Sequence, residues 1–402
     1  MKSLKLPLAF LSAVCAAHMA SAEDLRLLQF WHSPGELRAV NEIAKSAARA
    51  GLTLTDVPVS GDFTELRSAL LASLLEETPP DAAQWIVGDE LSKLIDDGVM
   101  IEVHANRVDL AKVLLPILYD AVRYKDGLSN MPVGIHIENF VVFNTGAFDR
   151  IGRPVPTSWA ELLEAAPALD AAGILPLVVS GQAWQMQNLF SNVLSSQLSA
   201  DEFRDYLEAS APPQDLRDQI KETFRILAGL RAYAPDELPD IDHVTGAAMV
   251  SRGEAAAYGL GDYVVPELLP GAQVVCTLSP GSPTVLMGVD GLVFVNNHDA
   301  GKEKLIRGFV DDFYGNGGAT AYVAAKGGVS VLAADHLKEP GDGCAGQSQR
   351  AWNAAAGRLM ISGNDWQNHL RIVGKFTVEF LSRQNMSPEE ATRTLLALMQ
   401  RM

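Results

Sequence analysis

The sequence lacks the short motifs that mark many catalytic sites. It contains neither the G-x-S-x-G element of serine hydrolases nor the H-E-x-x-H element of zinc peptidases. The glycine-rich stretch 315–318 is not followed by the Gly-Lys-Ser/Thr that completes a phosphate-binding loop. No pattern in the sequence pairs two carboxylates at a defined spacing for glycoside hydrolysis. We therefore expect a protein that is not an enzyme and that needs no metal or cofactor.

Cysteine is also scarce, with three residues in a chain of 402. Cys15 lies near the N-terminus, and Cys276 and Cys344 lie 68 positions apart in the second half of the chain. Two such distant cysteines make a poor zinc site, because structural zinc usually takes four ligands that often come in close pairs. We expect Cys276 and Cys344 to form a disulfide, and two unpaired thiols are the alternative.

Positive charge is in short supply. The chain has 32 Lys and Arg residues against 49 Asp and Glu residues, which gives a formal net charge of −17. A protein this acidic repels phosphate backbones and anionic lipid, so nucleic acid is a poor partner. Beyond the N-terminal segment, no apolar run reaches the about 18 residues that predict a membrane-spanning helix.

The N-terminal 22 residues have the pattern of a cleaved signal peptide. Lys2 and Lys5 precede an apolar run over 6–17, and Ala20-Ser21-Ala22 forms a small-residue cleavage site. The apolar run is too short to cross a bilayer, and Val14 does not suit a lipidation site at Cys15. We expect export to the periplasm, which leaves 402 − 22 = 380 residues, enough for two domains.

Hydrophobic periodicity predicts an α/β protein. A strand at 25–31, a helix at 36–50 and a second strand at 52–57 form the strand–helix–strand order of a parallel unit. The chain is mostly helical from 348 to its end. Between these regions, the sequence predicts helices at 63–77 and 302–314, and strands at 81–87, 131–133, 139–143, 174–179, 255–260 and 285–295.

Aromatic and planar polar residues gather at the predicted strand and loop ends. Sugars stack on aromatic rings and take hydrogen bonds from planar polar groups, and open α/β folds bind ligands at strand ends. Each residue also has a purely structural alternative, such as a core aromatic or a helix cap. The candidates are Trp31, His136, Trp184, Gln187, Asp262 and Lys326.

Several stretches, in order along nearly all of the chain after residue 22, resemble the family 1 extracellular solute-binding proteins of ABC importers. The resemblance is closest to the glucose/mannose-type branch. The opening Phe-Trp-His-Ser-Pro-Gly-Glu at 30–36 is similar to the start of these proteins, and Lys-Gly-Gly-Val-Ser at 326–330 is similar to a later segment. The other similar stretches are 131–136 with Asn139, 144–148 with Gly152, 156–159 and Glu161, then 253–256, 261–263, 276–281 and 344–348.

The resemblance implies a two-domain α/β fold of the periplasmic binding protein type (type II-like), with a hinge and an interdomain cleft that closes on one glucose-like monosaccharide. It divides the chain into a signal peptide at 1–22, an N-terminal lobe at 23–145 that recruits part of 285–345, and a C-terminal lobe at 146–402. The partners it implies are the permease subunits of an ABC importer, with the protein itself a monomer.

The resemblance also implies roles for individual residues. Trp31 and Trp184 would stack on the sugar ring. The hydroxyls would bond to Glu36, His136, Gln187, Asp262 and Lys326, with Asp290 as a further candidate.

The chain departs from the glucose-type pattern at two places. Ile86 stands where these proteins have a histidine, and Trp85 and Asp89 are candidates to rebuild that wall. His136 is followed by Ile137 and Glu138 rather than Arg and Ser. These changes leave the identity of the sugar open. An exported carbohydrate-active enzyme and a sensory binding protein for another small polar ligand remain alternatives.

Overall fold

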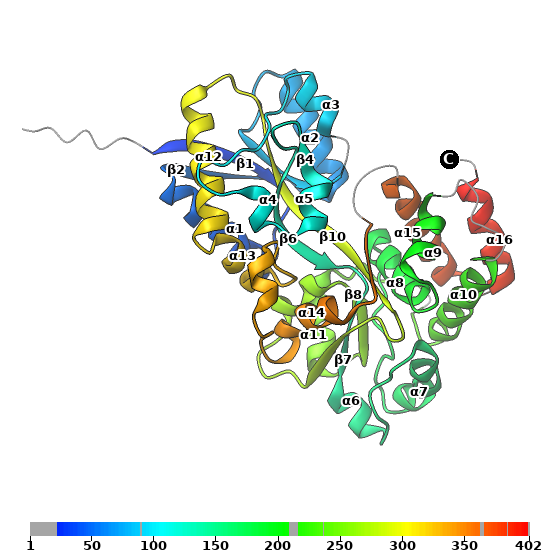
Figure 1. Cartoon of the computed structure of the whole chain (residues 1–402). Coiled ribbons are helices and arrows are strands. Elements are labelled where there is room, and N and C mark those ends of the chain that lie inside the picture. Colours follow the sequence, from blue (N-terminus) through cyan, green and yellow to red (C-terminus); the bar gives the residue numbers. More distant parts are fainter. Residues whose placement is uncertain are drawn as a thin grey trace, which may run out of the picture.

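A computed structural model describes residues 22–88, 91–208, 216–235, 237–361, 366–383 and 385–400. Except for Ala22, the predicted signal peptide lies outside these residues. Figure 1 shows two α/β bodies, one built around the strands labelled β1 and β2 and the other around β7 and β8. The predicted α/β class is confirmed by this alternation of helices and strands.

The first sheet has the strand order β11-β10-β3-β1-β2, and β6 pairs with β10. The predicted parallel unit is confirmed, because β1 and β2 pair in parallel register. The strands are β1 (Glu23–Gln29), β2 (Leu52–Pro58), β3 (Ala82–Ile86), β6 (Met131–Ile137), β10 (Thr284–Phe294) and β11 (Gly357–Met360). The helices that accompany them are α1 (Pro34–Arg49), α2 (Phe63–Leu75), α3 (Leu91–Asp96), α12 (Ala300–Gly315) and α13 (Gly318–Lys326).

The local sequence fixes where α1 begins. The side chain of Ser33 accepts the backbone N–H of Glu36, and the carboxylate of Glu36 accepts the backbone N–H of Ser33. This reciprocal capping box satisfies N–H groups that have no partner inside the helix. Pro34 suits the first turn because its fixed φ is already helical. The sequence of the helix start thereby holds the Glu36 carboxylate beside the loop that follows β1.

The second sheet has the order β8-β7-β9, with β7 (Phe140–Asn144) antiparallel to both β8 (Ala257–Leu260) and β9 (Val274–Leu278). Helices surround it and bury a core that includes Trp159, Phe190 and Phe224. These helices are α6 (Thr145–Arg150), α7 (Trp159–Ala171), α8 (Ala183–Ser195), α9 (Ala200–Glu208), α10 (Arg217–Arg231), α11 (His243–Arg252), α15 (Trp366–Ser382) and α16 (Pro388–Met399).

The remaining elements are short or lie between the two sheets. The 3-10 helix η2 (Asp262–Glu267) follows β8 and packs against α1, α11, α13 and β6. The others are α4 (Leu110–Val113), α5 (Pro116–Val122), β4 (Arg123–Tyr124), β5 (Gly127–Leu128), η3 (Ala333–Leu337) and α14 (Gly343–Ala354).

The chain passes from the first sheet to the second at Glu138 and Asn139, between β6 and β7. Asn139 is fully buried, and its amide nitrogen donates to Ser195 Oγ at 3.0 Å and to the carbonyl of Thr284 at 2.9 Å. Its amide oxygen accepts the N–H of Leu286 at 2.9 Å. One side chain therefore fastens this crossing to the start of β10.

One predicted strand is wrong. Residues 174–179 run beside β8, but only Leu175 forms a bridge, with Ala255. The N–H of Val178 donates to the carbonyl of Ala257. Pro176 interrupts the ladder because proline has no N–H to donate. The segment is therefore extended and hydrogen-bonded without being a regular strand.

Cys276 on β9 is joined to Cys344 on α14 by a disulfide, with the two Cα atoms 5.1 Å apart. The bridge ties the segment around α14 to the second sheet.

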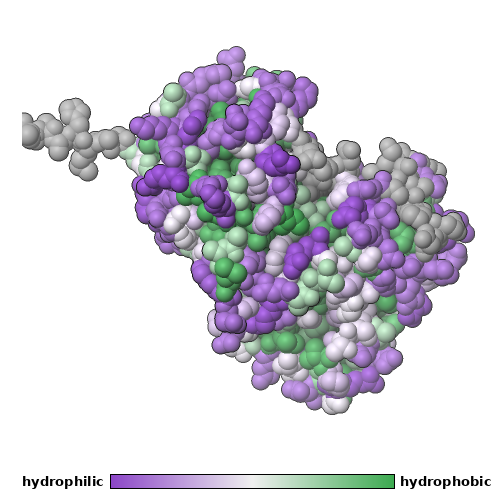
Figure 2. All heavy atoms as spheres, viewed as in Figure 1, coloured by the Kyte–Doolittle hydropathy of each residue, from purple (hydrophilic) through white to green (hydrophobic). Residues whose placement is uncertain are grey.

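None of the helices in the described residues is long and apolar enough to cross a membrane. Polar side chains dominate the face in Figure 2, and the apolar residues Leu75 and Leu337 are 87% and 89% exposed.

Candidate functional site

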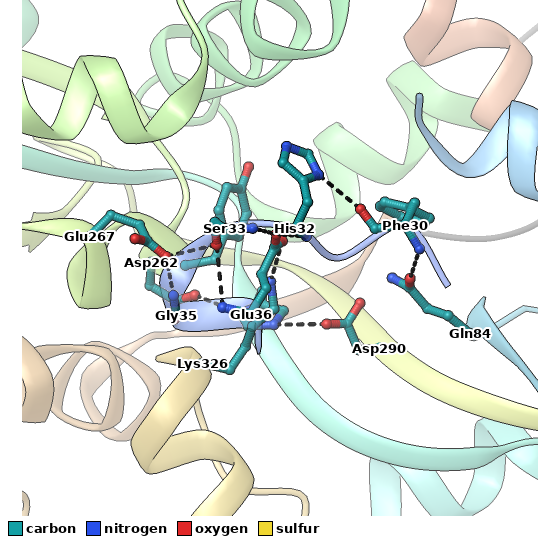
Figure 3. Close-up of polar contacts among 12 residues, drawn as sticks. Phe30, His32, Ser33, Gly35, Glu36, Gln84, Asp262, Glu267, Asp290 and Lys326 are labelled. Atoms are coloured by element: carbon teal, nitrogen blue, oxygen red, sulfur yellow. Dashed lines mark hydrogen bonds and ion pairs between the residues drawn. The ribbon is translucent and has the colours of Figure 1, made fainter. Parts of the chain in front are cut away.

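Polar side chains from segments far apart in the sequence meet at the start of α1. Figure 3 shows them gathered around the loop that follows β1, with Glu36 of α1 and Lys326 of α13 beside Asp262 of η2. The ends of β1, β6 and α13 all reach this point. Ligands of open α/β folds bind at such strand ends, so this cluster is the candidate site.

Glu36 and Lys326 form a buried ion pair. Lys326 Nζ lies 2.8 Å from Glu36 Oε1, and the side chains are 5% and 12% exposed, respectively. Glu36 Oε2 also accepts the backbone N–H groups of His32 and Ser33, each at 2.9 Å. Burial raises the pKa of Glu36, but Lys326 and the hydrogen bonds outweigh it and hold that pKa well below its usual range. The pair is therefore fully ionised at neutral pH.

His136 lies between two carboxylates. Its Nδ1 is 3.1 Å from Asp262 Oδ1, and its Nε2 is 3.1 Å from Asp290 Oδ2. Burial lowers the pKa of His136, but the two aspartates outweigh it and raise the pKa to about 9. An imidazolium that donates from both nitrogens fits this geometry. The hydroxyl of Tyr322 donates to the same oxygen of Asp290 at 3.0 Å, which extends the chain of contacts to α13.

The alternation of side chains along β-strands explains why His136 and Asp290 share one face of the sheet. Gly288 of β10 pairs with His136 of β6, and Asp290 pairs with Gly134. Alternate residues of a strand point to the same side, so His136 and Asp290 lie on one face. A Cβ at Gly134 would lie 2.7 Å from the Tyr322 ring, so glycine there makes room for that ring.

The free energy of unfolding should fall as the pH rises from about 7 to about 9.5, because His136 loses its proton. Its folded-state pKa is raised from 6.5 to about 9, so this stabilisation is complete below pH 6.5 and is lost as the pH rises through about 9. The total is about 3 kcal/mol. Urea unfolding at several pH values measures it. His136→Gln should flatten the pH dependence, and parallel curves for the variant and the wild type would contradict the assignment.

The two predicted tryptophans lie at different depths. Trp31 is 2% exposed and packs against Tyr322 with ring centroids 6.0 Å apart, while Lys326 Nζ lies 5.9 Å from its ring centroid. Trp184 is half-buried at the start of α8. The centroid of its ring lies 6.3 Å from that of Tyr263 and 6.2 Å from that of His243. Trp184 therefore offers more accessible aromatic surface than Trp31.

Gln187 is the predicted site residue with the weakest link to the cluster. It is half-buried, and its amide donates to Asn188 at 3.4 Å. A Cβ at Gly374 of α15 would lie 3.0 Å from the Cβ of Gln187, so this residue packs against α15. The remaining predicted residues are linked to one another by direct contacts or through Tyr263.

Sequence reasoning did not assign roles to several groups in the cluster. Glu138 Oε2 accepts the amide of Asn188 at 2.8 Å, and the Tyr263 hydroxyl lies 3.4 Å from the same oxygen. Glu138 follows His136 by two residues, so strand alternation could have placed both on one face. No such local signal existed for Asn188 or Tyr322, which come from distant helices.

Glu267 at the end of η2 joins this 3-10 helix to the start of α1. Its Oε1 accepts the hydroxyl of Ser33 at 2.7 Å and the backbone N–H of Gly35 at 2.8 Å. A carboxylate is favourable there because the helix N-terminus carries partial positive charge. A Cβ at Gly35 would lie 2.5 Å from Oε1, so the close approach needs glycine.

Trp85 does not rebuild the wall beside Ile86. It is 4% exposed and packs edge-to-face on Phe63 of α2, with ring centroids 5.0 Å apart. The alternation of β3 turns Trp85 away and directs its neighbour Gln84 to the backbone N–H of Phe30. Asp89 lies outside the described residues. Ile86 itself pairs with Asp290 in the strand register.

The described residues hold no group of three or more His, Cys, Asp or Glu side chains suited to a metal ion. The ionisable groups of the cluster are engaged instead with one another and with backbone N–H groups. Planar donors and acceptors next to aromatic rings can bind a polyhydroxylated ring through its hydroxyls and its C–H faces.

Comparison with known proteins gives a consistent match. Residues 39–320 match the family described as "Bacterial extracellular solute-binding protein". A relative from Brucella melitensis, described as "Probable sugar-binding periplasmic protein", is 30% identical over 66% of this chain and 65% of its own length. One from Rhizobium meliloti with the same description is 29% identical over 67% of this chain and 66% of its own length. The match thus spans slightly less than two thirds of these relatives.

Solved structures resemble the whole chain more completely. A chitin oligosaccharide binding protein has a TM-score of 0.73 at 15% identity and covers 95% of this chain and 99% of its own. The bacterial solute receptor AcbH, described as exclusively preferring β-D-galactopyranose, has a TM-score of 0.73 at 13% identity and covers 94% and 98%. These likenesses confirm the predicted periplasmic binding protein fold.

Proposed function

The chain belongs to the family of bacterial extracellular solute-binding proteins, and from this premise we propose that it captures a sugar and delivers it to an ABC importer. In this proposal the protein is exported, its signal peptide ends at Ala22, and it works in the periplasm as a monomer. The sugar-binding descriptions of the Brucella and Rhizobium relatives support the substrate class. The permease subunits of the importer are the proposed partners.

The observation that carries the proposal is the convergence of the Glu36–Lys326 pair, the His136 cluster and the rings of Trp184 and Tyr263. Charged and planar groups make strong, directional hydrogen bonds to hydroxyls, while the rings supply a stacking surface. Glu36, His136, Asp262, Asp290, Lys326 and Gln187 are the proposed hydroxyl-binding residues. Trp184 and Trp31 are the proposed stacking residues.

We assign the lobes as 23–145 with part of 285–345, and 146–402. The crossing at Asn139 and the long strand β10 are then the proposed hinge. A sugar that contacts Glu36 on one side and Asp262 on the other would bind the closed form more tightly than the open form. Such a ligand shifts the population toward closure.

A monosaccharide of the glucose type is the proposed ligand. The polar side chains from opposite lobes approach within 3.1 Å of each other, as between His136 and Asp262, which favours a small ligand. The resemblance to the glucose/mannose branch supports the same size. A solved neighbour is described as a chitin oligosaccharide binding protein, so related folds also accept oligosaccharides.

A thermal-shift screen of the purified exported protein against mono- and disaccharides tests the proposal. A sugar at about 100 times its Kd should stabilise the folded protein by about 2.7 kcal/mol, which raises the melting temperature visibly. If no sugar raises the melting temperature while amino acids or polyamines do, a sugar is rejected as the ligand. Consumption of the sugar during incubation would favour an exported enzyme instead.

Replacing Trp184 by alanine should weaken binding of the sugar by about 10-fold, because one stacked ring contributes up to about 1.5 kcal/mol beyond the area that it buries. Trp184 is only half-buried, so its loss should leave the circular dichroism spectrum unchanged. Trp184→Phe keeps a ring and is the matched control, which should bind within a few-fold of wild type. Titration calorimetry measures both. Unchanged affinity in Trp184→Ala would remove this residue from the site.

A further inference from the structure

Three carboxylates of the candidate site are more accessible than its cations, whereas the fourth, Asp262, is fully buried. Glu36 and Asp290 keep 12% and 15% of their side chains exposed, and Glu138 is half-buried, whereas Lys326 and His136 are each 5% exposed. The most exposed side chains of the cluster are therefore acidic.

Glu138 differs from the other two carboxylates because no cation pairs with it. Glu36 pairs with Lys326, and Asp290 pairs with His136. Glu138 Oε2 instead accepts only neutral donors, Asn188 Nδ2 at 2.8 Å and the Tyr263 hydroxyl at 3.4 Å. Among the described residues it has no salt bridge, so its charge is compensated only in part.

The surroundings of Glu138 add further negative charge. His136 of β6 is the nearby cation, but it already lies between Asp262 of η2 and Asp290 of β10. Burial, together with these two aspartates, raises the pKa of Glu138 to about 7 even though His136 and Asn188 lower it. Asp262 Oδ2 is also buried without a hydrogen-bond partner in the described part of the chain. The cluster therefore has a surplus of acceptors and a deficit of positive charge.

Backbone geometry holds the Glu138 carboxylate in the site. Its Oε1 lies over Gly288 of β10, where an added Cβ would be only 2.3 Å away. The Tyr263 hydroxyl lies 3.4 Å from Glu138 Oε2, and the centroid of its ring lies 6.3 Å from that of Trp184. The Glu138 carboxylate and the Trp184 ring are thus joined through one side chain, Tyr263, close enough for one small ligand to contact both.

We propose that Glu138 is the subsite for an ammonium group and that the preferred ligand is an amino sugar, a monosaccharide with a protonated amine. This inference rests on the sugar-binding function proposed above. A hydroxyl could donate to Glu138 but would leave its charge uncompensated. An ammonium group supplies both donors and charge, and charge-assisted hydrogen bonds are roughly twice as strong as neutral ones.

Titration calorimetry at neutral pH with D-glucosamine, D-glucose and N-acetyl-D-glucosamine tests the inference. Glucosamine should bind at least about 10-fold more tightly than the two uncharged sugars. Glu138→Gln keeps the shape and removes the charge, so it should lose that preference while binding glucose within about 3-fold of wild type. Glu254→Gln, an exposed residue with the same change of charge, is the matched control and should retain the preference.

The pH dependence gives a second readout on the wild type. The affinity for glucosamine relative to glucose should rise between pH about 6 and about 7, as Glu138 loses its proton while the ammonium group of the sugar stays largely charged. This readout keeps the inference testable if Glu138→Gln does not fold.

Three outcomes would overturn the inference. Glucose binding with no preference for glucosamine would reject the ammonium subsite and leave the sugar-binding function standing. A glucosamine preference that survives in Glu138→Gln would reject the role of Glu138. Failure of all three sugars, and of every other sugar in the thermal-shift screen, would remove the proposed function and the inference with it.

Discussion

Replacing Lys326 by methionine should lower the free energy of unfolding by about 3 kcal/mol or more and should abolish sugar binding. The variant leaves the Glu36 carboxylate buried without its cation, at 12% exposure. Breaking one partner of a buried pair costs about 3 to 5 kcal/mol, because the remaining charge is desolvated and unpaired. We expect a loss near the lower end of this range, because the Glu36 carboxylate still accepts hydrogen bonds from the backbone N–H groups of His32 and Ser33. Urea unfolding at pH 7 measures the loss.

Two controls separate this effect from the loss of any surface lysine. Lys93 makes an exposed ion pair with Asp97, so Lys93→Met should leave the free energy of unfolding essentially unchanged. The double variant Glu36→Gln with Lys326→Met removes both charges and should recover much of the stability without restoring binding. A Lys326→Met protein as stable as wild type would show that the pair is not buried as described.

Removing the disulfide by replacing Cys276 and Cys344 with alanine should lower the free energy of unfolding by about 4 kcal/mol. The bridge joins two residues that are 68 positions apart, and it restricts the unfolded chain between them. Guanidinium unfolding of the double variant measures the loss.

The wild type unfolded in the presence of a thiol reductant is the control for this prediction. It should lose nearly the same free energy of unfolding as the double variant, because both lack the bridge. The alanines add a small packing cost at Cys276, which is 3% exposed. Identical midpoints for oxidised wild type, reduced wild type and the double variant would contradict the contribution of the bridge.

Local sequence was enough to predict the elements around the site. The strand predicted at 25–31 and the helix predicted at 36–50 correspond to β1 and α1, each shifted by one or two residues. Amphipathic periodicity and a capping box depend only on residues close together in the sequence, so they can be recognised without knowing how distant segments pack. The strand predicted at 174–179 failed for an equally local reason, the missing N–H of Pro176.

Local sequence could not predict which residues contact one another in the site. His136 meets Asp262 and Asp290, which lie 126 and 154 positions away. Glu267 reaches Gly35 across 232 positions. Periodicity reports which face of an element is apolar, but it gives no distance between elements. The family resemblance supplied most of these residues as candidates, and it supplied none of the neighbours Glu138, Asn188, Tyr322 and Glu267.

Titration calorimetry of the wild type and of Lys326→Met, with a sugar that stabilises the wild type, tests the central claim most directly. The claim is that one sugar binds at the Glu36–Lys326–His136 cluster between the lobes. We predict one sugar bound per wild-type chain, and no measurable binding to the variant at a temperature where it remains folded. No heat from any sugar in the wild type, or equal affinity in the folded variant, would contradict it.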